Sequence, residues 1–598
     1  LDLSGAKEIA IDLETRDPGL MTMGSGAISG NGEVIGIAVA VDGWKGYLPF
    51  AHEDGKGCLG RKTVLKWFKS ILDLPADKIF HNAMYDVSWI RAMGFQINGR
   101  IIDTMIAASL INENRRSFTL DSVAREYAGI RKNEQLLQAA AKDWNINAKS
   151  EMWRLPAHFV GEYAERDAEA TLKLWHALKK ELDNQELWQV FNLETDLFPC
   201  LVDMRFKGVR VDLDKAEQTR KYLKLEEKKT RAELKKICGK DIEIWSAASI
   251  AVAFDELSIP YDKTEKGSPS FTKNFLATHP DEFARKLVHC RELDKMNSTF
   301  IETILKHEHK GRIHADINQI RSDDGGTVTG RFSYSNPNLQ QIPARHKILG
   351  PMLRSIFIPE EGCHWGCFDY SQQEPRILVH YANKMRMEGA DVIVDAYNAG
   401  DADFHQVVAD MAGIERKQAK TINLGLMYGM GKNKLMSELG LLKDEADQLL
   451  KNYHLNAPFV KMISDRVMRQ AEDTGIIRTL EGRACHFDLW QPDQFGVSTP
   501  LPLEDAKKTY GEFIKRAFTY KALNKLIQGS AADMTKRAMV NLYKEGVVPH
   551  IQVHDELDVS VESPEQAEKI IEIMEASAKL GVPNKVDYEK GPSWGEIK

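Results

Sequence analysis

Apolar and polar residues alternate along the stretch from Ile551 to Val561, on both sides of the tripeptide His554-Asp555-Glu556. This period of two predicts two short strands that meet at a turn, with Asp555 and Glu556 at the bend. Carboxylates held at a rigid turn can bind a divalent metal ion, although most acidic turns are simply solvated. The hairpin alone therefore leaves a metal site and a solvated turn as alternatives.

The same alternation occurs near the N-terminus. Across residues 8–14 it predicts a strand with Asp12 and Glu14 on one face. Two carboxylates on one face of a strand are costly to bury unless a cation lies between them. The pattern that follows predicts strands at 33–41, 46–50 and 78–80 and an amphipathic helix at 61–72.

Three more polar residues belong to this N-terminal region. Asp86 comes where the strand at 78–80 gives way to a helix, and Tyr163 lies one helical turn before Asp167. Taken singly, these residues and the two on the first strand read as a strand end, a helix cap and a surface pair. Taken together, four carboxylates and a tyrosine in an α/β unit of about 180 residues suit two hard cations and an attacking water.

The C-terminal part of the chain carries a second group of this kind. Asp369 is predicted at the end of a strand that is followed by a helix, as Asp555 is predicted at a strand end. A repeat of four residues predicts one helical stripe made of Arg416, Lys420, Leu424 and Tyr428. The stripe could be ordinary amphipathic surface, yet two cations one turn apart match a row of phosphates. Two aspartates that bridge two Mg²⁺ ions, beside a helix that binds a triphosphate, would suit in-line phosphoryl transfer.

Composition limits the class of protein without naming it. The 598 residues predict about four domain-sized units, and the formal charge of −7 permits local basic grooves but not a surface that binds nucleic acid everywhere. Seven dispersed cysteines indicate a reduced intracellular protein, and burial of Cys363 and Cys367 is favoured over a zinc knuckle because no second ligand pair has zinc spacing. No apolar run is long enough to predict a membrane span.

A basic region lies between the two groups of carboxylates. Residues 214–238 form a helical pattern with nine Lys or Arg against five Asp or Glu, which could equally be a solvated face. The loop that follows is rich in cations, hydroxyls and backbone amides. We expect it to contact the phosphates of a duplex without reading its sequence, through Lys263, Lys266 and Lys273.

The N-terminal residues resemble a known family. The order Asp-x-Glu at 12–14, Asn-x-x-Tyr-Asp at 82–86 and Tyr-x-x-x-Asp at 163–167 resembles the three motifs of DEDD-type 3′→5′ exonucleases, in their tyrosine variant. The resemblance implies a ribonuclease-H-like fold in which Tyr163 orients the attacking water. It also implies that the metal ions are held by Asp12, Glu14, Asp86 and Asp167.

From about Glu194 to Trp594 the chain closely resembles family-A DNA polymerases, the class of bacterial DNA polymerase I. The segments that carry the resemblance are Thr329-Gly330-Arg331, residues 367–376, residues 416–429, Gln528 to Asp533 and the C-terminal hairpin. The implied fold class is α/β multidomain, with the exonuclease domain followed by a right-hand polymerase of palm, thumb and fingers. The implied activity is template-directed DNA synthesis with proofreading, and the implied cofactor is Mg²⁺, two ions per active site, with Mn²⁺ able to substitute.

The resemblance also implies roles for residues. Asp369 and Asp555 would bind the two polymerase metals, with the Tyr370 carbonyl in one shell and Glu556 beside them. The incoming dNTP would be bound by Arg416, Lys420, Leu424, Tyr428 and Glu374, of which Lys420 is also catalytic and the last two form a steric gate against a ribose 2′-hydroxyl. DNA contacts would come from Arg331, Asn338, Gln340, Asn524, Gln528 and His554, besides the lysines of the basic loop. Leu424 stands where most members carry Phe or Tyr, so the treatment of modified sugars is open.

The implied domain order is an exonuclease over 1–187, a connector over 188–212, a thumb over 213–312, palm over 313–385, fingers over 386–515 and palm again over 516–598. The expected partners are primer–template DNA and dNTPs, with a replisome helicase, primase or single-strand-binding protein as further candidates, no membrane, and a monomeric enzyme. No 5′ nuclease region is evident in the sequence, which favours a replicative enzyme of a phage, in the host cytoplasm, or of an organelle matrix.

Three alternatives remain at this point. A phage-type single-subunit RNA polymerase shares the polymerase motifs, but Glu374 in the gate and the intact exonuclease motifs are unfavourable to it. An inactive accessory subunit that only clamps DNA would not need Asp369, Asp555 or Lys420. A translesion polymerase is the third alternative, although such members of the family usually lack a working exonuclease.

Overall fold

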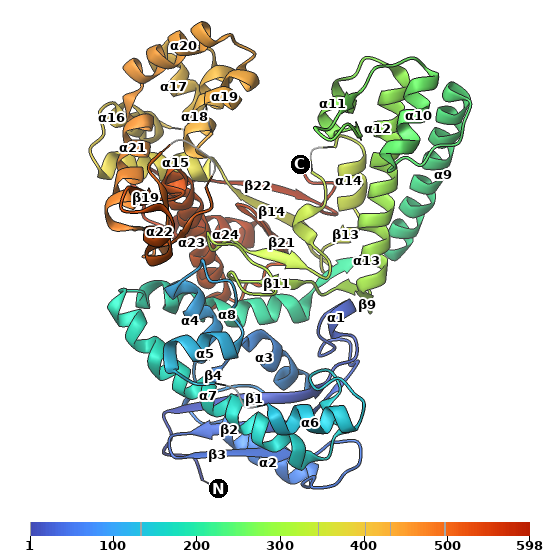
Figure 1. The fold of residues 1–598 in the computed structure, drawn as a ribbon, viewed down its shortest axis with the longest axis vertical. Coiled ribbons are helices and arrows are strands. Elements are labelled where there is room, and N and C mark those ends of the chain that lie inside the picture. The colour runs from blue at the N-terminus through green and yellow to red at the C-terminus, as the bar shows by residue number, and fades with distance from the viewer. Residues whose placement is uncertain (1, 132–133, 345, 401, 431, 495–497) are drawn as a thin grey trace.

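The computed structural model describes residues 2–131, 134–344, 346–400, 402–430, 432–494 and 498–598. Figure 1 shows an N-terminal unit below a central unit, from which two lobes rise with a wide space between their ribbons. The lobe in green contains helices α9 to α13, and the lobe in yellow and orange contains helices α15 to α21.

The N-terminal unit is built on a five-stranded sheet in the order β3-β2-β1-β4-β5. β2 is antiparallel to β1 and β3 to β2, whereas β4 is parallel to β1 and β5 to β4. The strands are β1 (Glu8–Arg16), β2 (Glu33–Val41), β3 (Trp44–Pro49), β4 (Asp77–Phe80) and β5 (Ile101–Asp103). The predicted strands are confirmed, with β3 shifted by about two residues at its start because Trp44 already pairs with Val41.

Helices cover both faces of this sheet. The face that carries Ala10 and Ala38 packs with α4, α5 and α7, and the face that carries Ile11 and Val39 packs with α2 and α3. The helices are α1 (Leu20–Met23), α2 (Arg61–Leu72), α3 (Ala83–Ala92), α4 (Thr104–Ile111), α5 (Leu120–Ala128), α6 (Gln135–Asp143) and α7 (Ala157–Asn184), with a 3₁₀ turn η1 (Met152–Arg154). Since Asp12 lies two residues after Ala10, the face with its carboxylate is the one that α7 covers.

Helix α8 (Trp188–Lys207) leads from this unit into the central one. The green lobe then has its own apolar core, which includes Leu234, Phe254 and Phe283. Its elements are α9 (Leu213–Cys238), α10 (Ala247–Glu256), β7 (Asp262–Lys263), β8 (Pro269–Ser270), α11 (Lys273–Thr278), α12 (Glu282–Lys295), the π-helical turn η2 (Met296–Ile301) and α13 (Glu302–His307). The predicted basic helix is α9, and Asp212 caps its N-terminus by accepting a hydrogen bond from the backbone of Lys215.

The central unit contains a four-stranded antiparallel sheet in the order β20-β21-β14-β22. Its strands are β14 (His364–Tyr370), β20 (Ile551–Val553), β21 (Glu556–Val561) and β22 (Val586–Gly591), packed with α23 (Ala522–Lys544) and α24 (Pro564–Ala576). A smaller sheet, in the order β13-β6-β10-β9, is formed by β6 (Val209–Val211), β9 (Glu308–His309), β10 (Arg312–Ile313) and β13 (Phe357–Ile358). The hairpin β11 (Asp316–Asn318) and β12 (Ser333–Ser335), η3 (Leu339–Gln341) and α14 (Leu349–Arg354) complete this unit.

The second lobe is mainly helical. Its helices are α15 (Gln373–Lys384), α16 (Ala390–Ala399), α17 (Phe404–Ala412), α18 (Arg416–Met427), α19 (Lys432–Leu439), α20 (Lys443–Asn456) and α21 (Pro458–Thr474). Short strands follow: β15 (Ile476–Arg478), β16 (Ala484–His486), β17 (Leu489–Pro492), β18 (Leu501–Pro502) and, after α22 (Leu503–Tyr510), β19 (Ile514–Arg516) and η4 (Thr519–Lys521). Glu415 and Gln418 form a capping box that begins α18, the helix of the predicted cationic stripe.

A buried ionic network joins the units. Glu194 on α8 accepts hydrogen bonds from Lys536 on α23 at 2.7 Å and from Arg483 at 2.5 Å, and Arg483 also contacts Asp533 at 2.8 Å. Breaking such a network from one side leaves an uncompensated buried charge, which typically costs about 3–5 kcal/mol. All seven cysteines are free, and none of the helices in the described part of the chain is long and apolar enough to cross a bilayer.

Two candidate active sites

The first site lies where β14 ends. Asp369 is the penultimate residue of β14, and its Cα partner on β21 is Glu556. Asp555 lies in the turn between β20 and β21, and its backbone oxygen accepts a hydrogen bond from the amide of Tyr370 at 3.2 Å. The structure therefore brings together Asp369, Tyr370, Asp555 and Glu556, which the sequence placed together only by resemblance.

The electrostatics of this site favour a cation. Burial, followed by the charges of Asp555 and Glu556, raises the pKa of Asp369 to about 8, and burial raises the pKa of Asp555. The Oδ1 atom of Asp369 is buried and has no hydrogen-bond partner among the described residues. Carboxylate oxygens that crowd together without a balancing charge are suitable ligands for hard divalent cations. The residues present therefore fit a metal site.

The predicted turn has a defined backbone. His554 adopts a left-handed conformation, with φ of 57°, between the two strands, and this conformation reverses the chain just before Asp555. Gln552 donates a hydrogen bond to the His554 carbonyl, and Gln340 donates to the Gln552 carbonyl at 3.2 Å. Gln340, a predicted DNA contact, thus lies against the hairpin that carries the carboxylates.

Helix α18 presents the predicted stripe to solvent. Arg416 and Lys420 are exposed, Leu424 is half-buried, and Tyr428 is exposed at the C-terminal end of the helix. The Arg416 guanidinium contacts Asp403 at 2.6 Å. The predicted stripe is therefore confirmed as a helix face with two cations at its start.

The two gate residues are in contact. The Tyr428 hydroxyl donates a hydrogen bond to Glu374 at 2.5 Å, and Arg331 forms an ion pair with the other oxygen of Glu374. Burial, followed by the charge of Glu374, raises the pKa of Tyr428. Three residues predicted on separate segments thus form one hydrogen-bonded unit next to the carboxylates.

The remaining predicted DNA contacts are divided between three places. Asn524 and Gln528 are half-buried one turn apart on α23, and Asn338 caps η3 by accepting a hydrogen bond from the Gln340 amide at 3.1 Å. Lys263 and Lys266 are exposed on the loop of β7 and β8 and Lys273 begins α11. Figure 1 shows α11 near the tip of the green lobe, away from the central sheet, so the structure does not bring these lysines to the carboxylates.

The second site lies under α7. Asp12 and Glu14 share one face of β1, and the buried Asp86 on α3 accepts a hydrogen bond from the Leu13 amide at 2.9 Å. Burial, followed by the charge of Asp12, raises the pKa of Asp86. This ties the α3 carboxylate to the strand that carries the other two.

Tyr163 and Asp167 complete the second site from α7. Burial raises the pKa of Tyr163, and the charges of Glu14 and Asp167 raise it further. Asp167 is buried. A cavity of about 190 Å³ is lined by Tyr163, Asp167, Lys45, Arg131 and Arg166, among others. The structure thus brings together all five predicted exonuclease residues, and two of them line a small cavity whose wall holds more cations than carboxylates.

Comparison with known proteins identifies the families of the two regions that contain these sites. Residues 213–596 match the family model "DNA polymerase family A", and residues 1–183 match the family model "3'-5' exonuclease". The chain belongs to DNA polymerase family A. It is a DNA-directed DNA polymerase with a 3′-5′ exonuclease domain, and enzymes with these domains depend on divalent metal ions.

Phage and bacterial enzymes are among the relatives of this polymerase. The DNA-directed DNA polymerase of Pseudomonas phage M6 is 36% identical over 99% of this chain and 94% of its own length. DNA polymerase DpoZ of Acinetobacter phage SH-Ab 15497 is 30% identical over 92% of this chain and 93% of its own length. DNA polymerase I of Geobacillus stearothermophilus is 30% identical over 92% of this chain and 62% of the bacterial enzyme.

A solved structure with a similar fold is the POL domain of Pol1 from M. smegmatis in complex with DNA primer-template and dNTP. Its TM-score is 0.78 at 26% identity, over 99% of this chain and 97% of that one. The predicted fold class is therefore confirmed: an exonuclease domain is followed by a right-hand polymerase domain. Because the chain is a DNA-directed DNA polymerase, the RNA polymerase alternative and the accessory-subunit alternative are excluded.

No pattern in the sequence singles out Tyr47, which lies next to the exonuclease carboxylates, or its hydrogen-bond partner His52. Tyr47 on β3 is the Cα partner of Ala38, which is itself the partner of Asp12. The Tyr47 hydroxyl lies 2.8 Å from His52 Nε2, and burial, followed by the charge of Glu14, raises the pKa of Tyr47. The period of two in β3 shows which residues share a face of that strand. It does not show that Tyr47 lies on the same face of the sheet as Asp12, because that depends on the register between β3 and β2.

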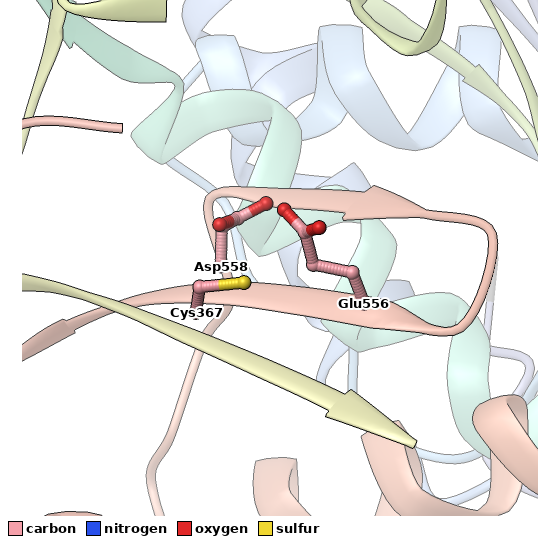
Figure 2. Close-up of side chains that lie close together, drawn as sticks. All are labelled: Cys367, Glu556 and Asp558. Carbon is pink, nitrogen blue, oxygen red and sulfur yellow. The ribbon is translucent and has the colours of Figure 1, made fainter. Parts of the chain in front are cut away.

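A cluster beneath the polymerase carboxylates was also missed. Cys367 pairs across the strands with Asp558, and a ligand atom of each lies within 4.8 Å of one of Glu556 (Figure 2). Trp365 donates a hydrogen bond to Asp558 at 2.8 Å and Trp594 donates one to Glu556 at 3.0 Å. Burial and the charge of Glu556 raise the pKa of Asp558. The Glu556 carboxylate is therefore held toward Asp558 by the indole of Trp594.

Proposed function

We propose that this enzyme is a replicative polymerase in which Asp369 and Asp555 hold two Mg²⁺ ions, for which Mn²⁺ can substitute, with the Tyr370 carbonyl in one shell. The observation that carries the proposal is the crowding of half-buried carboxylates around the unpartnered Asp369 Oδ1. When bound, the two ions supply charge neutralisation and activation of the primer 3′-oxygen for in-line attack on the α-phosphate of a dNTP.

Residues of α18 and α15 position the nucleotide in this proposal. Arg416 and Lys420 face solvent one turn apart, where they can contact successive phosphates of the triphosphate. The hydrogen bond between Tyr428, at the C-terminal end of α18, and Glu374, in the first turn of α15, fixes both side chains. Together they leave no room for a ribose 2′-hydroxyl, which gives selection of dNTPs over rNTPs.

We propose that the exonuclease site shortens mispaired primers. Asp12, Glu14, Asp86 and Asp167 would hold two divalent ions, and the Tyr163 hydroxyl would orient the water that attacks the terminal phosphodiester. The small cavity with Lys45, Arg131 and Arg166 in its wall suits the phosphates of a single-stranded DNA end.

We further infer that primer–template DNA lies between the two lobes, with the lysines of the basic loop on the duplex phosphates and with Arg331, Asn524, Gln528 and His554 near the primer terminus. The M. smegmatis structure, which is a complex with primer-template DNA and dNTP, supports these two ligands. We further propose a monomeric replication enzyme that works in the host cytoplasm, beside a helicase, a primase or a single-strand-binding protein; the polymerases of two phages among the relatives support only its phage type.

One gel assay tests the proposal. A 5′-labelled primer on a longer template is incubated with Mg²⁺ and dNTPs, with rNTPs, or without nucleotides. We expect extension with dNTPs, little with rNTPs and shortening of the primer without nucleotides, all abolished by EDTA. Extension with rNTPs as efficient as that with dNTPs would contradict the steric gate, and a primer that stays intact without nucleotides would contradict the exonuclease site.

A further inference from the structure

Three side chains that can bind a metal ion converge on the neighbouring strands β14 and β21. Cys367 faces Asp558 across these strands, and Glu556 lies on the same face of β21, two residues before Asp558. The Cys367 sulfur and one oxygen of each carboxylate lie within 4.8 Å of one another, and Figure 2 shows them turned toward a common gap. Within the described part of the chain, no other group of three or more His, Cys, Asp or Glu side chains comes this close. We call these three residues the thiol–carboxylate cluster.

One carboxylate oxygen of the thiol–carboxylate cluster is buried without a partner. Asp558 is fully buried, and its Oδ1 atom accepts a hydrogen bond from the Trp365 indole at 2.8 Å. Its Oδ2 atom has no hydrogen-bond partner among the described residues. A carboxylate removed from water is costly unless a cation or a proton compensates its charge. The Oδ2 atom of Asp558 therefore indicates a ligand that the protein itself does not supply.

Two tryptophans orient the carboxylates of the cluster. Trp365 donates its hydrogen bond to Asp558, and Trp594 donates one to the Oε1 atom of Glu556 at 3.0 Å. The two indoles are buried and stacked, with ring centroids 6.0 Å apart and an angle of 22° between their planes. Hydrogen bonds of this kind commonly orient the carboxylates of metal sites, because they hold one oxygen and leave the other for the ion. The stacked indoles thus supply a rigid support for two metal ligands.

A proton and a metal ion are the two ligands to weigh for this gap. A proton shared by Glu556 and Asp558 would account for two facing carboxylates, but it would leave the Cys367 sulfur, which points into the same gap, without a role (Figure 2). A thiolate selects Zn²⁺ over Mg²⁺ and Ca²⁺, which take six or more oxygen ligands. Three protein ligands also suit a tetrahedral ion. Glu556 is the least buried of the three residues, so the fourth position, for a water molecule, lies on its side.

We propose that Cys367, Glu556 and Asp558 bind one Zn²⁺ ion, which is separate from the ions of the two catalytic centres. The thiol of Cys367 loses its proton to solvent when the bond between zinc and sulfur forms. The bound ion joins β14 to β21 and so fixes the register of the strands that end beside Asp369 and Asp555. The zinc ion is thus a structural ion behind the polymerase centre, and it takes no part in phosphoryl transfer.

Cobalt substitution tests the proposal, because a thiolate bound to Co²⁺ gives a charge-transfer band in the near ultraviolet that carboxylates do not give. The full chain is stripped with EDTA, kept reduced, supplied with excess Mg²⁺ for the catalytic carboxylates and titrated with Co²⁺. We expect a band that saturates at one cobalt ion per chain and disappears when Zn²⁺ displaces the cobalt. After gel filtration in Mg²⁺, elemental analysis should find one more zinc ion per chain in the parent protein than in Cys367→Ser.

Matched variants separate the ligands from their surroundings. Cys367→Ser should lose the band, whereas Cys363→Ser, which changes a half-buried thiol four residues earlier, should keep it. Asp558→Asn keeps the side-chain volume and should bind Co²⁺ at least about tenfold less tightly, and Trp594→Phe, which removes only the donor to Glu556, should do so by about tenfold. Zn²⁺ should raise the thermal unfolding midpoint of the parent protein and of Cys363→Ser but not that of Cys367→Ser. The midpoints without metal show whether each variant is folded.

Two results would overturn the proposal. A parent protein that shows neither the band nor the additional zinc ion would mean that the gap between Glu556 and Asp558 holds a proton. A band that persists in Cys367→Ser would place the cobalt ion on another of the seven cysteines. Failure of the proposed function is a separate result, because it would appear in the primer-extension assay and not in the cobalt spectrum.

Discussion

Both catalytic regions contain carboxylates that can bind metal ions, but the side chains around these carboxylates differ between the two regions. In the exonuclease site Glu14, Asp86 and Asp167 are buried, and the side chains next to them include the phenols of Tyr47 and Tyr163. Three elements, β1, α3 and α7, lock these carboxylates in place before any ligand arrives. A site of this kind can accept a DNA end and a water molecule but little more.

The polymerase site is more open. Asp369 and Asp555 are only half-buried, and the exposed cations Arg416 and Lys420 lie on the neighbouring lobe. A triphosphate brings several negative charges, so a site that takes it needs counter-charges besides the metal ions. The comparison shows that one protein can separate a closed hydrolytic centre from an open synthetic one, and each prediction below changes one centre and uses the other as its control.

The largest effects should come from the metal carboxylates. Asp369→Asn should lower primer extension by roughly a thousandfold, because losing a metal ligand removes several kcal/mol of transition-state stabilisation. Degradation of single-stranded DNA should stay within twofold. Asp12→Ala should give the reverse pattern, and steady-state kinetics on the two substrates measure both. If either variant lost both activities while its unfolding midpoint was unchanged, the separation of the two centres would be wrong.

A smaller effect is expected at the sugar gate. Glu374→Ala should raise the ratio of rNTP to dNTP incorporation by roughly a hundredfold, since it removes the group that would clash with the 2′-hydroxyl. Tyr428→Phe is the matched control, because it removes only the hydrogen bond to Glu374 and should shift the ratio much less. Single-nucleotide insertion kinetics give the ratio, and an unchanged ratio in Glu374→Ala would contradict the gate.

Features set by local periodicity could be predicted from the sequence. The period of two in β1 gives the common face of Asp12 and Glu14, and the helical period gives the stripe of Arg416 and Lys420. In both cases the residues are close in the chain, so backbone geometry alone fixes their relation. The same argument gave the turn at Asp555.

Features set by register or by distant packing could not be predicted. Tyr47 reaches Glu14 only through the pairing of three strands, and a slip of one residue would turn its side chain to the other face. The bond between Lys536 and Glu194 joins residues 342 positions apart. A single sequence does not show which lysine meets which glutamate over such separations.

Within the exonuclease centre, two phenols allow a finer test. Tyr163→Phe should lower the exonuclease rate about tenfold, because a hydroxyl bonded to charged groups is worth roughly 1.5–3 kcal/mol. Tyr47→Phe makes the same chemical change next to the same carboxylates, but its hydroxyl is engaged with His52. We expect only a fewfold loss there. Equal losses in single-turnover assays would show that Tyr163 has no special part in orienting the water.

The smallest effect concerns the contact that joins the two regions. The exonuclease residue Glu113 accepts hydrogen bonds at 2.7 Å from the amide and the Nδ1 atom of His486, near the base of the second lobe. Burial lowers the pKa of His486, but the hydrogen bond and charge of Glu113 outweigh burial, and the net pKa is raised.

A raised histidine pKa stabilises the folded contact below the unfolded value of about 6.5, and this stabilisation is lost as the pH rises through the folded pKa. Hydrogen exchange of β16 should therefore become faster relative to β14 as the pH rises above about 6.5, after correction for the intrinsic rate. His486→Gln should remove this dependence, while both catalytic activities persist. If β16 showed the same pH response in the variant, the two regions would be held together by contacts that do not titrate, such as the Glu194 network.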